Sequence, residues 1–184
     1  MKKQFLLISI CLINLIAFGQ THGEKAPIGK ITDYKGHDDN GKLIAEGRID
    51  EDYHKYGKWI YYYDTGKVSQ EETYKNWHCV GEKKRYFENG NLKEYLLFDD
   101  NGNLKKCKRY YSNGQIRLDS ATDGQFDDWN PYFDGTVLMY HENGALMMVG
   151  QMENQMCKGD WIYYNEDGSI KETIDKSGKY FYDD

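Results

Sequence analysis

Seven glycines placed at a regular spacing constrain this chain more than any other feature of its sequence. Successive members are 12, 24 or 25 residues apart, except for one gap of 30 residues. The seven are Gly41, Gly66, Gly90, Gly102, Gly114, Gly144 and Gly168. A fixed period over most of a chain is the signature of a repeat array, in which each unit packs only against its neighbours. We therefore predict a unit of about 24 residues with a 12-residue half-period.

A second glycine lies nine residues before the first in four copies, at Gly57, Gly81, Gly135 and Gly159. The segment 57–68, GKWIYYYDTGKV, is therefore closely similar in sequence to the segment 159–170, GDWIYYNEDGSI. The copy that ends at Gly114 has Lys105 in place of the upstream glycine, and residues 118–134 interrupt the period. We expect irregular structure at these two places.

The residues around each of the seven glycines predict a hairpin turn. Asn, Asp or Thr precedes the glycine, and Asp, Glu or Ser stands one place earlier. Asn, Asp and Gly tolerate left-handed backbone angles and form side-chain-to-backbone turn bonds. A three-residue loop, with a type I turn and a left-handed glycine, places the fourth residue before the glycine opposite the second residue after it.

Those two flanking positions form an aromatic and an aliphatic column. The first holds His37, Tyr62, Tyr86, Phe98, Tyr110, Tyr140 and Tyr164. The second holds Leu43, Val68, Leu92, Leu104, Ile116, Leu146 and Ile170. Cross-strand pairs of this kind stabilise a sheet by roughly 0.2–1 kcal/mol each. We predict an all-β fold, an elongated single-layer antiparallel meander of eleven to thirteen strands with a continuous apolar stripe. Residues 179–184 are expected to form a last edge strand.

Composition agrees with short strands and excludes some functions. The chain has 17 tyrosines and 2 prolines, and its charged content of 29% beside 39% hydrophobic residues is not that of a disordered chain. Its net charge of −6 disfavours nucleic acid as a partner, because phosphate binding needs a basic face.

The N-terminus has the features of an export leader. Lys2 and Lys3 precede an apolar run over 5–18, and Ala17-Phe18-Gly19 is a small-x-small cleavage signal. We predict a signal peptide at 1–19, a lead-in or capping strand at 20–35 and the repeat array at 36–184. A retained membrane anchor or a lipidated Cys11 are the alternatives. No second apolar run follows, so the mature chain is expected to be soluble and periplasmic, cell-surface or secreted.

The pattern G-x-W-x-x-Y-Y-x-x-[ND]-G-x-[ILV] resembles the MORN repeat in its bacterial variant form. GEKKRYFENGNL and GTVLMYHENGAL follow it more loosely, and the resemblance covers residues 36–182. It implies an elongated β-hairpin sheet that serves as an interaction or assembly module, in some cases on membrane lipid. Some bacterial relatives are labelled antitoxins, a label that an export leader does not suit. The same segments also look like aromatic repeats of choline- and glucan-binding cell-wall proteins, but no Thr-Gly-Trp occurs here.

The strand face away from the apolar stripe varies from copy to copy, as a binding surface would. It is aromatic at both ends and basic in the middle, where Lys83, Lys84, Arg85, Lys108 and Arg109 lie. Tyr, Trp and Arg are common interface anchors. The predicted binding surface consists of Trp59, Tyr61, Lys83, Arg85, Arg109, Met139, Trp161 and Tyr163. The alternative interpretation is that Trp59 and Trp161 only cover the second face of the sheet.

Motifs for chemistry are sparse. The loop 119–135 holds five aspartates, which suit a solvated acidic loop or a calcium site, although no calcium-binding spacing is present. No His-x-x-x-His, Cys-x-x-Cys, Gly-x-Ser-x-Gly or phosphate-binding glycine loop occurs. Cys79 and Cys157 lie about 30 Å apart in an array with strands about 4.8 Å apart, too far for a disulfide. We expect no catalytic residue, no metal and no cofactor.

These observations predict an exported, non-catalytic scaffold that binds another protein at the cell envelope. One alternative is a glycan-binding or cell-wall-binding module that stacks sugars on Trp59, Tyr61, Trp161 and Tyr163. A small hydrolase is the remote alternative. The oligomeric state does not follow from the sequence.

Overall fold

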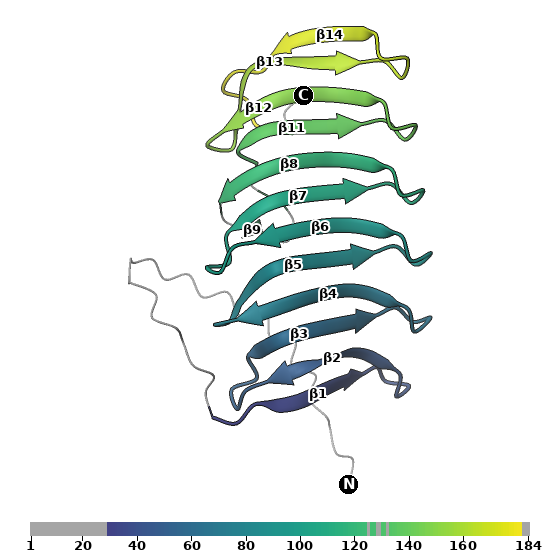
Figure 1. Cartoon of the computed structure of the whole chain (residues 1–184), viewed down its shortest axis with the longest axis vertical. Coiled ribbons are helices and arrows are strands. Elements are labelled where there is room, and N and C mark those ends of the chain that lie inside the picture. Colours follow the sequence, from purple (N-terminus) through teal and green to yellow (C-terminus); the bar gives the residue numbers. More distant parts are fainter. Residues whose placement is uncertain (1–28, 125, 128–129, 132, 182–184) are drawn as a thin grey trace.

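The computed structural model describes residues 29–124, 126–127, 130–131 and 133–181, and the predicted leader lies outside them. The described residues form a 12-stranded antiparallel sheet and a separate two-stranded hairpin, as the repeat predicts (Figure 1). The sheet contains β1 (Thr32–His37), β2 (Leu43–Ile49), β3 (Lys55–Tyr62), β4 (Val68–Lys75), β5 (His78–Tyr86), β6 (Leu92–Phe98), β7 (Leu104–Tyr110), β8 (Ile116–Gly124), β11 (Gly135–Tyr140), β12 (Leu146–Glu153), β13 (Met156–Tyr164) and β14 (Ile170–Asp175). The hairpin contains β9 (Phe126–Asp127) and β10 (Asn130–Pro131). Each strand of the sheet pairs with its neighbour in the sequence, apart from the step from β8 to β11.

The predicted turn chemistry is confirmed at all seven glycines. In the β3–β4 turn, the Gly66 amide donates to the Tyr63 carbonyl at 2.8 Å, and the Tyr63 amide donates to the Lys67 carbonyl at 2.8 Å. Gly66 has a φ of 79°, in the left-handed region that glycine adopts at little cost. Tyr62 consequently lies opposite Val68, and the same pairing of aromatic and aliphatic columns recurs in the other copies.

Three turns at the opposite edge of the sheet lack glycine and were not predicted. Between β2 and β3, Tyr53 takes the place of the glycine with a φ of 63°. Asn76 and Trp77 both have positive φ and join β4 to β5, while Asn154 and Gln155 join β12 to β13 in the same way. Two consecutive residues with positive φ form a two-residue type I′ hairpin, whose twist matches that of the strands. The asparagine in each pair is the sequence signal for this turn.

The upstream glycines form bulges that bend the sheet. At Gly57, Gly81 and Gly159 three residues of one strand face a single residue of the preceding strand. Positive φ values of 64–65° at these glycines accommodate the extra residues. The copy with Lys105 in this place has no such bulge between β6 and β7, so the irregularity expected there is confirmed.

One residue from each of the strands β3 to β8 and β11 to β13 belongs to a buried column that crosses the sheet. We call the face that carries this column the inner face. Trp59, at the first bulge, packs against Gly47, and Trp161 packs against Gly150. A Cβ atom built on Gly150 would lie 2.0 Å from Cδ2 of Trp161, so no larger residue fits beside the indole ring. Between these ends the column contains Glu72, Lys83, Leu96, Cys107, Ser120 and Val137, all buried.

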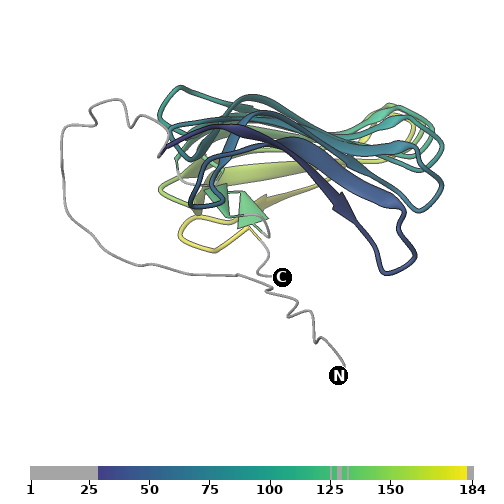
Figure 2. The same ribbon diagram turned by 90° about the horizontal axis from the view of Figure 1, so that it is seen from below.

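The C-terminal half of the inner face is covered. Figure 2 shows the sheet curved over the β9–β10 hairpin and the C-terminal segment, which both lie beneath it. The rings of Phe133 and Phe181 lie 5.4 Å apart, and Phe181 lies 5.5 Å from Trp161. The prediction of a last edge strand at 179–184 is therefore wrong. The edge strand is β14, whereas Tyr180 forms a bridge with Met156 and the chain turns back over the core.

Phe98 and Leu104 of the predicted apolar stripe are 5% and 0% exposed and belong to the inner-face core. The rest of the stripe lies on the outer face and is half-buried or exposed. Its tyrosine hydroxyls bond to carboxylates, as Tyr62 does with Glu46 at 2.5 Å and Tyr86 does with Glu71 at 2.7 Å. The main hydrophobic core instead lies on the inner face, because the bulges and the covering segments remove that face from water.

Candidate functional site

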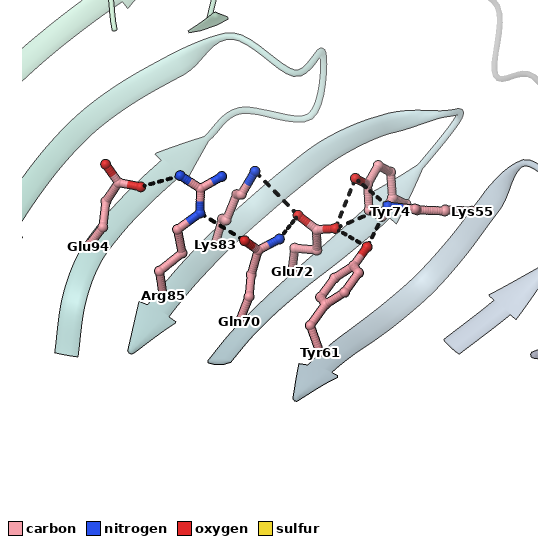
Figure 3. A network of polar contacts seen from close by, with 8 residues as sticks. All are labelled: Lys55, Tyr61, Gln70, Glu72, Tyr74, Lys83, Arg85 and Glu94. Atoms are coloured by element: carbon pink, nitrogen blue, oxygen red, sulfur yellow. Dashed lines mark hydrogen bonds and ion pairs between the residues drawn. The ribbon is translucent and has the colours of Figure 1, made fainter. Parts of the chain in front are cut away.

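The N-terminal half of the inner face carries a network of polar side chains rather than an apolar core (Figure 3). Its members come from β3 to β7 and include residues predicted from the sequence. The inner-face network consists of Lys55, Tyr61, Gln70, Glu72, Tyr74, Lys83, Arg85, Glu94 and Arg109. Buried polar groups require partners, and such a network therefore holds its side chains in one arrangement.

Glu72 is the centre of this network, with a side chain that is 2% exposed. It accepts hydrogen bonds from the Tyr61 hydroxyl at 2.7 Å and the Gln70 amide at 2.9 Å, and forms an ion pair with Lys83 at 3.4 Å. Burial opposes ionisation of this carboxyl. The Lys83 ammonium and the Tyr61 hydroxyl nevertheless lower its pKa below the usual value, so Glu72 is charged at neutral pH.

Tyr61 and Lys55 complete the network at its N-terminal side. Burial first, and then the charge of Glu72, raise the pKa of the Tyr61 hydroxyl, so it remains protonated and donates to that carboxylate. The Lys55 ammonium lies 5.0–5.1 Å from the ring centroids of Trp59, Tyr61 and Tyr74. Aromatic faces at this distance stabilise a cation.

A second carboxylate, Glu94 on β6, is held between two arginines on neighbouring strands. Its Oε2 atom lies 3.1 Å from Nη1 of Arg85 on β5, and its Oε1 atom accepts from Nε of Arg109 on β7 at 3.0 Å. Arg85 also donates to Gln70 at 2.8 Å, which links Glu94 to the Glu72 centre.

These arginines border a recess of about 340 Å³, which we call the basic recess. Its lining residues are Arg85, Phe87, Lys93, Glu94, Arg109, Tyr110 and Arg117. Four of them are cationic and one is anionic. The local charge is thus positive in a chain whose net charge is −6.

A second recess of about 440 Å³, the tyrosine recess, shares Arg85 and Lys93 with the first. Its other lining residues are Ile44, Tyr61, Tyr62, Tyr63, Ser69, Gln70 and Tyr86. The two recesses together place aromatic rings beside a cluster of cations, a combination typical of protein-binding surfaces.

The structure places seven of the eight predicted binding residues in two groups, with Trp59 buried beside the first. Tyr61, Lys83, Arg85 and Arg109 belong to the inner-face network. Trp161 is a core residue of the covered half, and Met139 and Tyr163 pack against that core. Trp59 is 4% exposed and Trp161 1%, so these rings cover the sheet and are not open platforms. A binding role for the eight residues stays a prediction.

Sequence reasoning missed Glu72, Glu94, Lys93 and Arg117. Lys93 and Arg117 stand three residues after a turn glycine, at bulges that shift the register by one residue. Each is the extra residue of its bulge and has no partner across the strands, so pairing by alternation does not place it, and both line the basic recess. Conversely, Lys84 and Lys108, which the sequence grouped with the basic residues, lie on the outer face, where Lys108 pairs with Asp119 at 2.9 Å.

Other predicted features carry little chemistry. Cys79, Cys107 and Cys157 are free thiols, and the spacing predicts this for Cys79 and Cys157. The side chains of Asp123, Asp127 and Asp128, on which the calcium hypothesis depends, lie outside the described residues. Within the described residues no cluster of three or more potential metal ligands occurs. The same part of the chain has no helix suited to crossing a membrane.

Comparison with known families identifies the hairpins. The model of the MORN repeat variant matches residues 55–76, 80–100 and 133–154. These segments contain the β3–β4 and β11–β12 hairpins and all of the β5–β6 hairpin except its first two residues. Three hairpins of the chain thus match the MORN repeat variant. MORN repeats are commonly modules that bind proteins or membranes, and they are in general non-catalytic. No curated protein is significantly similar to the chain in sequence. Two of the three MORN matches contribute side chains to the inner-face network.

Proposed function

We propose that this protein is an exported, non-catalytic scaffold whose repeats bind another protein at the cell envelope. The observation that supports this best is the pair of adjoining recesses, one basic and one lined by tyrosines, which share Arg85 with the inner-face network and reach the turn edge of the uncovered half of the sheet. Arg and Tyr are enriched at protein interfaces because they combine apolar contact area with directional hydrogen bonds.

The electrostatics of the network favour binding over acid–base catalysis. A catalytic acid or base works best with a pKa near the working pH. The partners of Glu72 move its pKa down, and burial moves that of Tyr61 up, so both shifts lead away from neutrality. The network therefore suits a rigid surface whose charges are fixed.

Export is proposed from the leader at 1–19, which lies outside the described residues. Its charged start, apolar run and cleavage signal support secretion through the general export route. Mass spectrometry of the protein from fractionated cells tests this. We expect an envelope or extracellular species that begins at Gln20, whereas an intact N-terminus in the cytoplasmic fraction would contradict export.

A pull-down from envelope extract tests the scaffold function. The bait is the wild-type protein beside a variant with Lys93→Glu and Arg117→Glu, which reverses two exposed charges at the basic recess. The matched control is Lys171→Glu, an exposed lysine at the corresponding bulge on β14, outside both recesses. We expect a protein band with wild type and control that is lost with the double variant. A band that all three baits capture equally would refute the placement of the surface.

The glycan-binding alternative loses its main residues, because the Trp59 and Trp161 rings are buried. Sugar stacking requires an open aromatic face. Retention on purified cell-wall polysaccharide, with no protein captured, is the outcome of the same experiment that would favour it.

A further inference from the structure

The basic recess has more cations than its own carboxylate balances. Arg85 and Arg109 share Glu94, whereas Lys93 and Arg117 are exposed and lie over aromatic rings. Lys93 lies 5.7 Å from the Phe87 ring centroid and Arg117 lies 6.0 Å from that of Tyr111. Within the described residues neither of these two side chains forms an ion pair. Like charges held together in a concave site raise the local concentration of an anionic ligand.

We infer that the basic recess binds carboxylate side chains of an extended acidic segment in the partner protein, while an aromatic or apolar side chain of that segment enters the tyrosine recess. This inference rests on the proposed function and specifies the chemistry of the partner.

Glu94 shows how the recess recognises a carboxylate. Each of its two oxygens takes a bond from a different guanidinium, at 3.1 and 3.0 Å. Arginine forks match carboxylate geometry, and charge-assisted bonds of this kind are stronger than neutral ones. An incoming carboxylate would meet Lys93 and Arg117 at the rim, beside the two arginines that already hold Glu94.

The surroundings of the recess favour a narrow ligand. The turn edge of the sheet carries an exposed carboxylate two residues before most turn glycines, among them Asp64, Glu88 and Glu142. The copy beside Arg117 has the neutral Ser112 instead. A broad polyanion, such as a nucleic acid duplex or a membrane surface, would meet this row of negative charge, whereas a single peptide strand enters past Ser112.

The distance across the two recesses sets the length of the segment. Tyr61 lies on β3 and Arg117 on β8, which are separated by five strand spacings, or about 24 Å. An extended peptide advances about 3.3 Å per residue, so roughly seven residues reach from one recess to the other. We expect an aromatic residue near one end of that segment and Asp or Glu near the other.

A labelled peptide tests the inference directly. The probe is a fluorescein-labelled heptapeptide with tyrosine at one end and glutamates at the other, titrated with purified protein by fluorescence anisotropy at low and physiological salt. The comparison peptide has glutamine in place of every glutamate. The protein variants are Lys93→Gln with Arg117→Gln, and the control Lys171→Gln. Both positions of the double variant are exposed, and far-UV circular dichroism verifies that it folds.

We expect the glutamate peptide to bind, with an affinity that falls as salt is added. The glutamine peptide and the double variant should each weaken binding by about tenfold or more, while Lys171→Gln stays within about twofold. Equal binding of both peptides, or equal binding by wild type and double variant, overturns the inference. So does displacement by inorganic phosphate as effective as the peptide, or binding to phosphatidylglycerol vesicles without peptide binding. If the pull-down still captures a partner protein but the peptide does not bind, the scaffold function stands and only the inference about the acidic segment is overturned. If neither the partner nor the peptide is bound, both proposals are overturned.

Discussion

The fit between Gly150 and Trp161 makes the sharpest prediction about stability. Gly150 lies opposite a bulge on β13, and its φ is not in the left-handed region, so alanine is compatible with its backbone. A Cβ atom there would lie 2.0–2.4 Å from three atoms of the indole ring, which is far inside van der Waals contact. Gly150→Ala should therefore act through overpacking alone.

The magnitude follows from the packing. Overpacking a buried site costs about 1–3 kcal/mol, and alanine in place of a strand glycine otherwise stabilises by up to about 1 kcal/mol. We expect a net loss of about 1–2 kcal/mol in the free energy of unfolding. For a chain of this size that corresponds to a fall in Tm of roughly 2–8 °C.

A double-mutant cycle isolates the steric cause. Trp161→Val alone should cost about 3–5 kcal/mol, because it empties a buried aromatic site. In that background Gly150→Ala should be neutral or stabilising, which gives a coupling free energy of at least about 1 kcal/mol. The matched control is Gly36→Ala on β1, where a Cβ atom would approach only the end of the Tyr34 ring at 3.1 Å. It should change stability by about 0.5 kcal/mol or less.

Urea unfolding followed by far-UV circular dichroism measures wild type and the four variants, because that signal does not depend on tryptophan. If Gly150→Ala lowers the free energy of unfolding equally in the wild-type and Trp161→Val backgrounds, the loss arises from the backbone, and the steric clash with the indole ring is refuted. A Gly36→Ala loss as large as that of Gly150→Ala would do the same.

Three further predictions concern ionisable groups. Glu72→Gln removes the carboxylate charge that lies 3.4 Å from the buried Lys83 ammonium and should lower the free energy of unfolding by about 3 kcal/mol, as urea titration at pH 7 would measure. Because the folded-state pKa of Glu72 is lowered, its contribution is complete above the unfolded value of 4.5 and is lost as pH falls through the folded value. The urea midpoint should thus fall below about pH 4.5 in wild type, and more weakly in Glu72→Gln. Burial, and then a hydrogen bond to Glu71, raises the pKa of Tyr86 to about 12. Spectrophotometric titration of the folded protein should therefore show tyrosines that ionise well above pH 10, and the free energy of unfolding should decline as pH rises past 10. A single uniform tyrosine transition near pH 10 would contradict this prediction. Burial raises the pKa of the Cys107 thiol to about 12, so maleimide labelling of the native protein should modify the half-buried Cys79 first, and rapid labelling of Cys107 would show that its site is open.

The period of the glycines was sufficient to predict the sheet, because each turn depends only on local chemistry. Asn, Asp or Thr before a glycine favours a tight turn, and the aromatic and aliphatic columns that flank it select the three-residue loop, which determines which residues face each other. Strand order then follows from chain order, so the meander needs no long-range information. The type I′ turns at Asn76-Trp77 and Asn154-Gln155 were not predicted, because no glycine marks them in the sequence.

Which face is buried could not be predicted in this way. Alternation places Trp59, Lys83 and Trp161 on the face opposite Tyr62 and its equivalents, but it does not show which face is removed from water. The close fit of the indole rings against Gly47 and Gly150, and the segments that cover the C-terminal half, decide that. The folding back of the chain at Phe181 is a tertiary event with no local pattern.

The candidate site was predicted in part for the same reason. Tyr61, Lys83, Arg85 and Arg109 share one strand face by simple alternation and were found. Lys93 and Arg117 sit at bulges and were missed, although their column, three residues after each turn glycine, can be recognised in the repeat once the bulge is known. Glu72 and Glu94 were missed because a carboxylate on a predicted aromatic and basic face gives no sign of its burial.

Site-specific photocrosslinking tests the central claim, that the uncovered half of the inner face binds the partner, most directly. A photoreactive phenylalanine analogue replaces Lys93 at the basic recess or Lys58 on the outer face, where the Lys58 side chain is 61% exposed and pairs with Glu71 at 2.7 Å. After irradiation in envelope extract, we expect a crosslinked protein band from position 93 and none from position 58. A band from position 58 alone would contradict the claim and place the partner on the tyrosine stripe of the outer face.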